Sequence, residues 1–62
     1  MKIDNELMTD ISGYMDDVKR EYVHTRLAPC TNEYFLKEYC KLDTDFEYFL
    51  DVEFGIDIDE LE

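Results

Sequence analysis

The stretch from residue 44 to residue 55 reads TDFEYFLDVEFG and carries markers for both ends of one helix. Thr44 and Glu47 have the spacing of a capping box, in which two side chains satisfy free backbone N–H groups of the first turn. Gly55 stands where helices commonly end in a left-handed residue. We therefore expect a helix here, with four apolar side chains facing a core, namely Phe46, Phe49, Leu50 and Phe54.

A shorter helix is expected upstream, after a loop at residues 28–32 that contains the only proline. Thr31 or Asn32 can cap its start. Its inward-facing residues are expected to be Phe35, Leu36 and Tyr39. At about two turns, such a helix must depend on tertiary packing.

The longest apolar stripe in the chain starts at Leu7, and Asp4 or Asn5 can cap the helix that it predicts. Steps of three and four residues connect its members, which are Leu7, Met8, Ile11, Tyr14, Met15, Val18 and Tyr22. Gly13 lies inside this run and lowers helix stability by up to about 1 kcal/mol relative to alanine. We expect one continuous helix that survives Gly13 with at most a kink.

Beyond Gly55, residues 56–59 alternate apolar and acidic side chains. Four residues do not decide between a short edge strand and an extended tail, although Ile56 and Ile58 can continue the core in either case. The sequence thus predicts an all-α fold, with residues 1–62 forming one small three-helix domain and a short C-terminal edge strand as the alternative feature.

The size of the chain argues against an enzyme, because 62 residues bury only roughly 60% of their unfolded surface and cannot enclose a walled cleft. His24 is the only imidazole that could activate a nucleophile such as Cys30, and an acidic environment disfavours thiolates in general. Cys30, Cys40 and His24 lack the spacing of a zinc site. We expect no catalysis, no metal and no cofactor.

The two cysteines are expected to be free and at least half-buried, because nothing in the sequence indicates an oxidising compartment. The N-terminus has acidic residues where a signal peptide needs a basic region, and no apolar run approaches the roughly 20 residues of a membrane span. We therefore expect a cytoplasmic protein.

Charge is distributed unevenly along the chain. The sequence has 17 acidic and 6 basic side chains, a formal net charge of -11. Residues 42–62 hold 9 of the acids and none of the bases. Such a field favours basic partners and disfavours nucleic acid and anionic membranes. A helix selected for stability alone would mix both signs, so the acidic segment is a candidate binding surface.

The candidate partner-binding residues form a row along the last helix and its extension. Asp43, Glu47 and Asp51 are four residues apart, which places them on one helix face. Tyr48 lies among carboxylates, where it suits an interface anchor that receives a guanidinium on its ring. The full set is Asp43, Asp45, Glu47, Tyr48, Asp51, Glu53, Asp57 and Asp59.

In size and acidity the chain resembles the small phage-encoded DNA-mimic inhibitors, such as anti-CRISPR proteins and inhibitors of uracil-DNA glycosylase. The resemblance implies an inhibitor that acts in a bacterial host cell by occupying a basic, nucleic-acid-binding groove of a host protein. Two alternatives remain open. One is an acidic regulatory module for a basic protein surface unrelated to nucleic acid, and the other is a self-associating helical protein. Both a monomer and a homodimer are compatible with the sequence.

Overall fold

The structure is a computed structural model that describes residues 2–27 and 29–61. These residues form four α-helices, a π-helical turn and a 3-10 turn. Their bounds are α1 Asn5–Ser12, α2 Asp17–Leu27, α3 Asn32–Leu42, α4 Thr44–Phe49, η1 Leu50–Phe54 and η2 Ile58–Glu60. The predicted all-α class is confirmed, and the segment considered for an edge strand contains the 3-10 turn instead.

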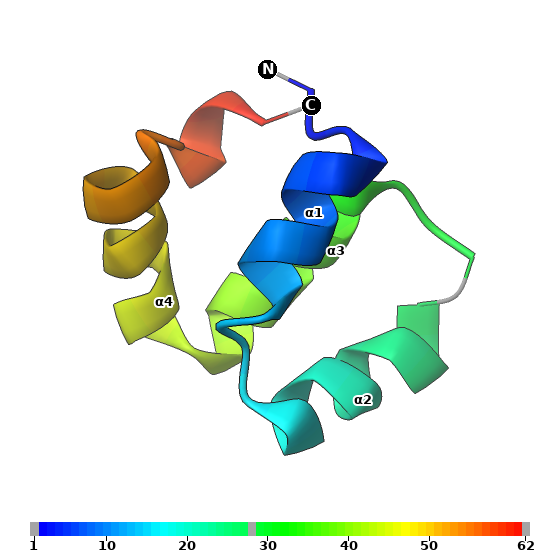
Figure 1. The fold of residues 1–62 in the computed structure, drawn as a ribbon. Coiled ribbons are helices and arrows are strands. Elements are labelled where there is room, and N and C mark those ends of the chain that lie inside the picture. Colours follow the sequence, from blue (N-terminus) through cyan, green and yellow to red (C-terminus); the bar gives the residue numbers. More distant parts are fainter. Residues whose placement is uncertain (1, 28, 62) are drawn as a thin grey trace.

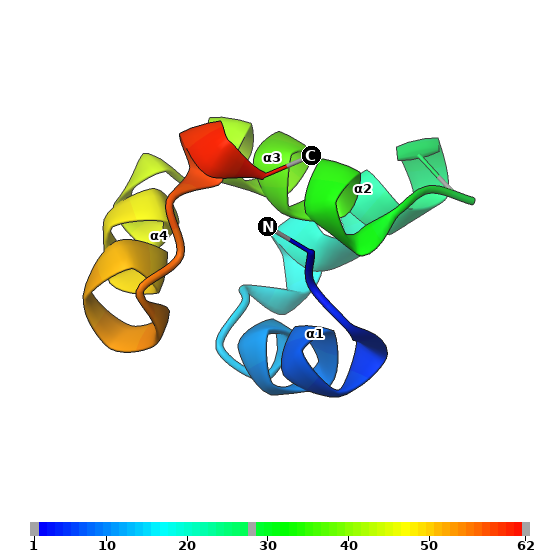
Figure 2. The same cartoon turned by 90° about the horizontal axis from the view of Figure 1, so that it is seen from above.

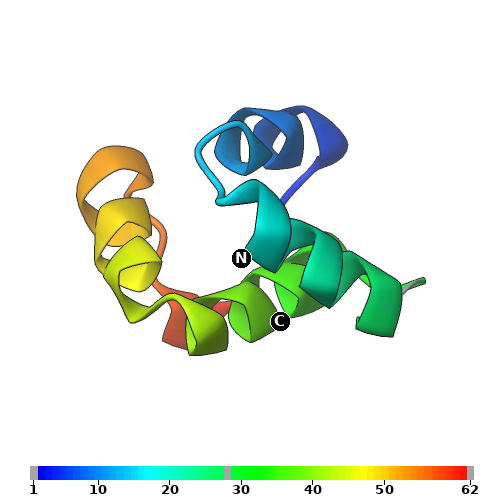
Figure 3. The same cartoon turned by 90° about the horizontal axis from the view of Figure 1, so that it is seen from below.

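Helix α3 lies between α2 and α4 and contacts both (Figures 1 and 3). Helix α1 occupies a separate layer, which is clearest in the view from above (Figure 2). The segment after Gly55 returns toward α3, so η2 lies beside α3 and away from α1 (Figure 2). In the described parts of the chain, no helix is long and apolar enough to cross a membrane.

The core draws side chains from almost every element. Its most deeply buried members are Ile11 of α1, Leu36 and Tyr39 of α3, Leu50 of η1, and Ile56. Fully burying a side chain such as leucine contributes about 1.5–3 kcal/mol relative to leaving it exposed. Ile56 and Ile58 are both buried, so the expected continuation of the core beyond the last helix is confirmed.

The expected continuous first helix is wrong, because the chain turns between Gly13 and Asp16 and forms two helices. The Asp16 carboxylate accepts a hydrogen bond from Lys19 N at 3.0 Å, so it caps a new helix at this point. Gly13 has low helix propensity and ends α1 as its C-cap residue, with φ −64°. Together, a poor helix former and a strong cap separate α1 from α2, and the predicted three helices become four.

This turn changes which part of the apolar stripe reaches the core. Ile11 and Met15 are buried, whereas Tyr14, Val18 and Tyr22 are 63%, 78% and 50% exposed. In a straight helix all five would share one face. Because α2 runs in a different direction from α1, only Val23 of α2 is buried.

The other helix ends follow the sequence more closely. Asp4 caps α1 by accepting from Leu7 N at 2.8 Å, and Thr31 caps α3 by accepting from Tyr34 N at 3.1 Å. Helix α3 is longer than predicted, with 11 residues. The N-cap of α4 is Asp43 and not Thr44, which is the first helical residue.

The predicted third helix changes geometry along its length. Its last five residues, Leu50–Phe54, form the π-helical turn η1. Such turns are rare and usually occur as single insertions within α-helices. Gly55 ends the turn in the left-handed conformation, with φ 65°, as the sequence predicts. Its N–H bonds to Asp51 O, and Ile56 N bonds to Leu50 O, each at 3.1 Å.

Tyr39 connects three elements through its hydroxyl group. The ring is fully buried, and Oη accepts a hydrogen bond from Asp16 N at 2.8 Å. The same hydroxyl donates to Asp43 Oδ2 at 3.4 Å. Burial raises the pKa of Tyr39, and the Asp43 carboxylate raises it further, so the hydroxyl stays protonated and able to donate. The turn before α2, helix α3 and the cap of α4 therefore meet at one buried atom.

Replacing Tyr39 by phenylalanine should destabilise the fold by about 1–3 kcal/mol, because Asp16 N–H loses its acceptor in a half-buried place. Urea unfolding followed by circular dichroism measures the change. Tyr34→Phe is the matched control, because Tyr34 is 47% exposed. Equal stability of the two variants would show that the Tyr39 hydroxyl contributes nothing.

Candidate partner-binding surface

The acidic surface is formed by α4 and η1. Some of its carboxylates lie where the helix dipole favours negative charge, and others lie where the dipole opposes it. Asp45 and Glu47 lie in the first turn of α4, where negative charge is favoured. Asp51 and Glu53 lie in η1, toward the opposite end, with no basic residue in its last turn. Each such carboxylate opposes the helix by about 0.3–1 kcal/mol. Stability alone does not explain their presence.

Five of the predicted binding residues surround one hollow of about 310 Å³. Glu47 and Tyr48 belong to α4 and Asp51 to η1, and the segment after Gly55 brings Asp57 and Asp59 to the same place. Ile56 and Ile58 are buried in the core and fix that segment against the rest of the fold. Carboxylates distant in sequence thus converge on one concave surface.

Tyr48 and Asp57 have different roles at this hollow. Tyr48 is 73% exposed, as the sequence predicts for an outward-facing tyrosine. Asp57 Oδ1 accepts from Asp59 N at 3.0 Å and thereby caps η2, so its carboxylate has a structural role as well. The other carboxylates of the hollow are exposed to solvent.

Three predicted residues lie elsewhere. Asp43 is turned inward and only half-buried, with Oδ1 accepting from Phe46 N at 3.3 Å and Oδ2 lying 3.7 Å from Lys19 Nζ. Glu53 lines a different hollow beside Tyr14. Asp45 is exposed in the first turn of α4. The outermost acidic residue, Glu62, lies outside the described residues.

Two lysines of α3 border the acidic surface, which the charge count along the sequence missed. Lys37 and Lys41 line a hollow of about 410 Å³ together with Glu47 and Asp59. Lys41 also forms an ion pair with Glu38. The sequence did contain a sign of this grouping, because Lys37 and Lys41 are four residues, or about one helical turn, apart and so share one face of α3. In the structure this face lies beside η2.

The cysteines do not form a reactive pair. Cys30 is exposed and Cys40 is buried, and both are free, so the expected burial is correct only for Cys40. Burial raises the pKa of Cys40 to about 12, with Glu47 and Asp43 adding to the shift.

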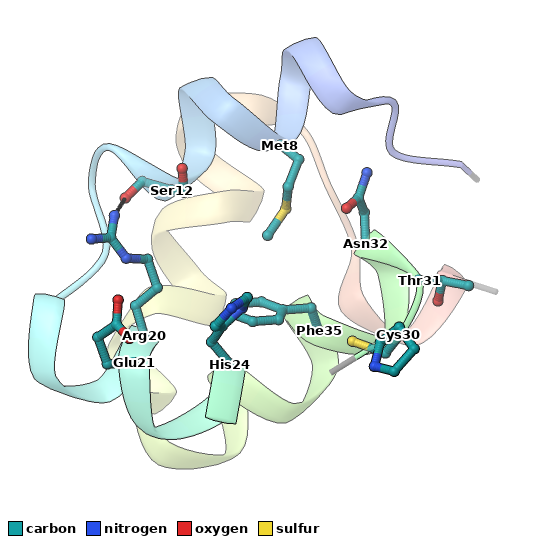
Figure 4. A pocket seen from close by; sticks show the side chains of 10 residues that line it. Met8, Ser12, Arg20, Glu21, His24, Cys30, Thr31, Asn32 and Phe35 are labelled. Atoms are coloured by element: carbon teal, nitrogen blue, oxygen red, sulfur yellow. Dashed lines mark hydrogen bonds between the residues drawn. The ribbon is translucent and has the colours of Figure 1, made fainter. Parts of the chain in front are cut away.

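Another hollow, of about 570 Å³, lies under α1 and is lined by residues of α1, α2, α3 and the loop before α3 (Figure 4). Met8 points from α1 toward Phe35 and His24, and Cys30 lies at the loop end of the same space (Figure 4). His24 and Cys30 thus share a hollow, although no group of three potential metal-binding side chains occurs in the described residues.

A family model described as anti-CRISPR protein AcrIC5 matches residues 2–42. The chain belongs to the AcrIC5 family of anti-CRISPR proteins. No curated protein and no solved structure matches it. Membership supports an inhibitor rather than an enzyme, and it implies a host CRISPR–Cas protein as the partner. The match covers α1, α2 and α3 and ends before Asp43, so the acidic surface lies outside the matched part of this family member.

The two thiols should differ strongly in reactivity toward Ellman's reagent at pH 8. The pKa of Cys40 is raised from 9.0 to about 12, which lowers its thiolate fraction about a thousandfold, whereas Cys30 is exposed. We expect the folded protein to show one fast thiol, which is absent in Cys30→Ser, and two in urea. Rapid labelling of folded Cys30→Ser would contradict the burial of Cys40.

Proposed function

We propose that this anti-CRISPR protein inhibits by mimicking DNA. The acidic hollow formed by α4, η1 and η2 occupies a basic, nucleic-acid-binding groove of a CRISPR–Cas protein. The observation that carries the proposal is the convergence of Glu47, Asp51, Asp57 and Asp59 around one concave surface with Tyr48 at its side. Proteins that bind DNA present lysine and arginine side chains to its phosphates, and carboxylates fixed on a helix can pair with the same side chains.

The energetics favour a distributed contact. A single exposed ion pair contributes only about 0.2–1 kcal/mol, so tight binding requires several pairs and some removal of water. The hollow supplies concave walls, and its exposed carboxylates give a field that speeds association with a cationic groove. Tyr48 adds an aromatic ring that can receive a guanidinium group.

The setting follows from the same proposal. The protein would be carried by a phage or another mobile element and would act in the cytoplasm of the bacterial host. It would bind neither DNA nor RNA itself, because its net charge of -11 repels phosphates.

Reversing two charges of the hollow tests this proposal. Glu47→Lys with Asp51→Lys should weaken binding to the inhibited CRISPR–Cas complex by more than about tenfold and flatten the salt dependence of the affinity. Titration at several salt concentrations measures both. Glu6→Lys with Asp10→Lys is the matched control, because these exposed residues of α1 have the same types and spacing. Equal losses in the two double variants would contradict a specific role for the hollow.

Competition separates DNA mimicry from binding elsewhere on the target. We expect the complex saturated with this protein to lose its binding of target DNA, measured by fluorescence anisotropy of labelled DNA. Normal DNA affinity in the saturated complex would overturn mimicry and favour a regulatory module that binds a basic surface unrelated to nucleic acid.

A further inference from the structure

We propose that α2 carries a second docking surface, which receives an apolar side chain flanked by carboxylates on the inhibited CRISPR–Cas complex. This surface, called the α2 strip, consists of Val18, Tyr22 and Arg26 of α2 with Lys41 and Leu42 of α3. This inference rests on the proposed function in one respect only, namely that the target is a CRISPR–Cas complex. It does not depend on DNA mimicry.

The α2 strip exposes more apolar surface than the fold requires. Val18 and Tyr22 are one helical turn apart on α2 and are 78% and 50% exposed. Leu42 is 44% exposed and shares a hollow with Tyr22. Single exposed apolar residues are ordinary on protein surfaces, but neighbouring ones mark interaction sites.

The size of this hollow indicates what enters it. Its volume is about 210 Å³, and it lies where α2 packs against α3. Typical small-molecule sites measure roughly 300–1,000 Å³, so this one is too small for most such ligands. Its apolar walls are Tyr22, Val23, Leu27 and Leu42, and three charged residues complete the lining, namely Arg26, Glu38 and Lys41. An apolar side chain presented by a protein fits such a space.

Cationic groups flank the hollow on both helices. The Arg26 guanidinium lies 5.1 Å from the centre of the Tyr22 ring, which holds it over the aromatic face. Lys41 stands on the α3 side, where it pairs with Glu38 while its side chain remains 71% exposed. Because Glu38 lines the same hollow and pairs with Lys41, a carboxylate on the partner complements chiefly Arg26. Nucleic acid fits poorly, because it offers no aliphatic side chain and the net charge of -11 opposes it.

The α2 strip lies within the part of the chain that the family model matches. All of its residues fall within the matched residues 2–42, whereas the acidic hollow begins at Thr44. The hollow on the α2 side and the acidic hollow lie on different sides of α3, since α2 and α4 flank it (Figures 1 and 3). Lys41 lies between them, because it also borders the hollow that Glu47 and Asp59 line. One protein can therefore contact a basic surface and an acidic, apolar surface at the same time.

Two substitutions with matched controls test the α2 strip. Affinity for the purified CRISPR–Cas complex that the wild-type protein inhibits is measured by biolayer interferometry, after thermal unfolding has confirmed that each variant is folded. Arg26→Glu should weaken binding at least tenfold. The control Lys2→Glu makes the same charge change at an exposed cation outside the strip, and it should leave the affinity unchanged or raise it, because added negative charge favours a cationic groove.

The apolar half of the strip is tested in the same way. Tyr22→Ser should weaken binding at least tenfold, while Tyr34→Ser, a tyrosine of similar exposure in the first turn of α3, should not. Equal or tighter binding of Arg26→Glu than of Lys2→Glu would overturn the proposal, as would equal binding of the two serine variants. If wild-type protein self-associates in sedimentation and Arg26→Glu abolishes this, the occupant is a second copy and the proposal is wrong.

The outcome is separable from that of DNA mimicry. Loss of affinity in Arg26→Glu together with unchanged affinity in the Glu47→Lys, Asp51→Lys variant supports the α2 strip and overturns the acidic hollow. The reverse result supports the hollow and overturns the strip.

Discussion

The buried hydroxyl of Tyr39 is the constraint on which the arrangement of the helices depends. It receives the N–H of Asp16 and donates to Asp43, the residues that cap α2 and α4. The direction in which α2 leaves α1 and the direction in which α4 leaves α3 are therefore set at the same point. Asp43 also forms an ion pair with Lys19, so the hydrogen-bond network around Tyr39 ends in a charged pair near the surface.

The sequence predicted the elements better than it predicted their directions. The all-α class, the caps at Asp4 and Thr31 and the left-handed Gly55 follow from local backbone chemistry, which the sequence contains directly. The break at residues 13–16 does not. Periodicity alone continued the stripe through Gly13 and did not take account of the local cap that Asp16 provides. The hydrogen bond from Asp16 N to Tyr39, 23 residues away, is a tertiary contact that the local sequence does not contain.

For the acidic surface, the candidate residues were predicted from the sequence, but which of them lie together in space was not. Charge counting identified the segment, and the structure then separated Asp43 as a structural cap from the carboxylates that surround the hollow. The convergence of Asp57 and Asp59 with Glu47 depends on a reversal of the chain after Gly55, and helical spacing contains no information about that turn. The α2 strip was not predicted, because two of its members, Val18 and Tyr22, were assigned to the core-facing stripe of the first helix.

The burial of Ile56, Ile58 and Leu61 has a consequence for the entropy of complex formation. A flexible acidic tail would lose backbone freedom of about 1–2 kcal/mol for each residue that became ordered on a partner. Here the residues between the carboxylates are already fixed by the core, so Asp57 and Asp59 are presented in one arrangement before any partner arrives. The alternation of isoleucine and aspartate thus makes residues 56–59 a preorganised surface.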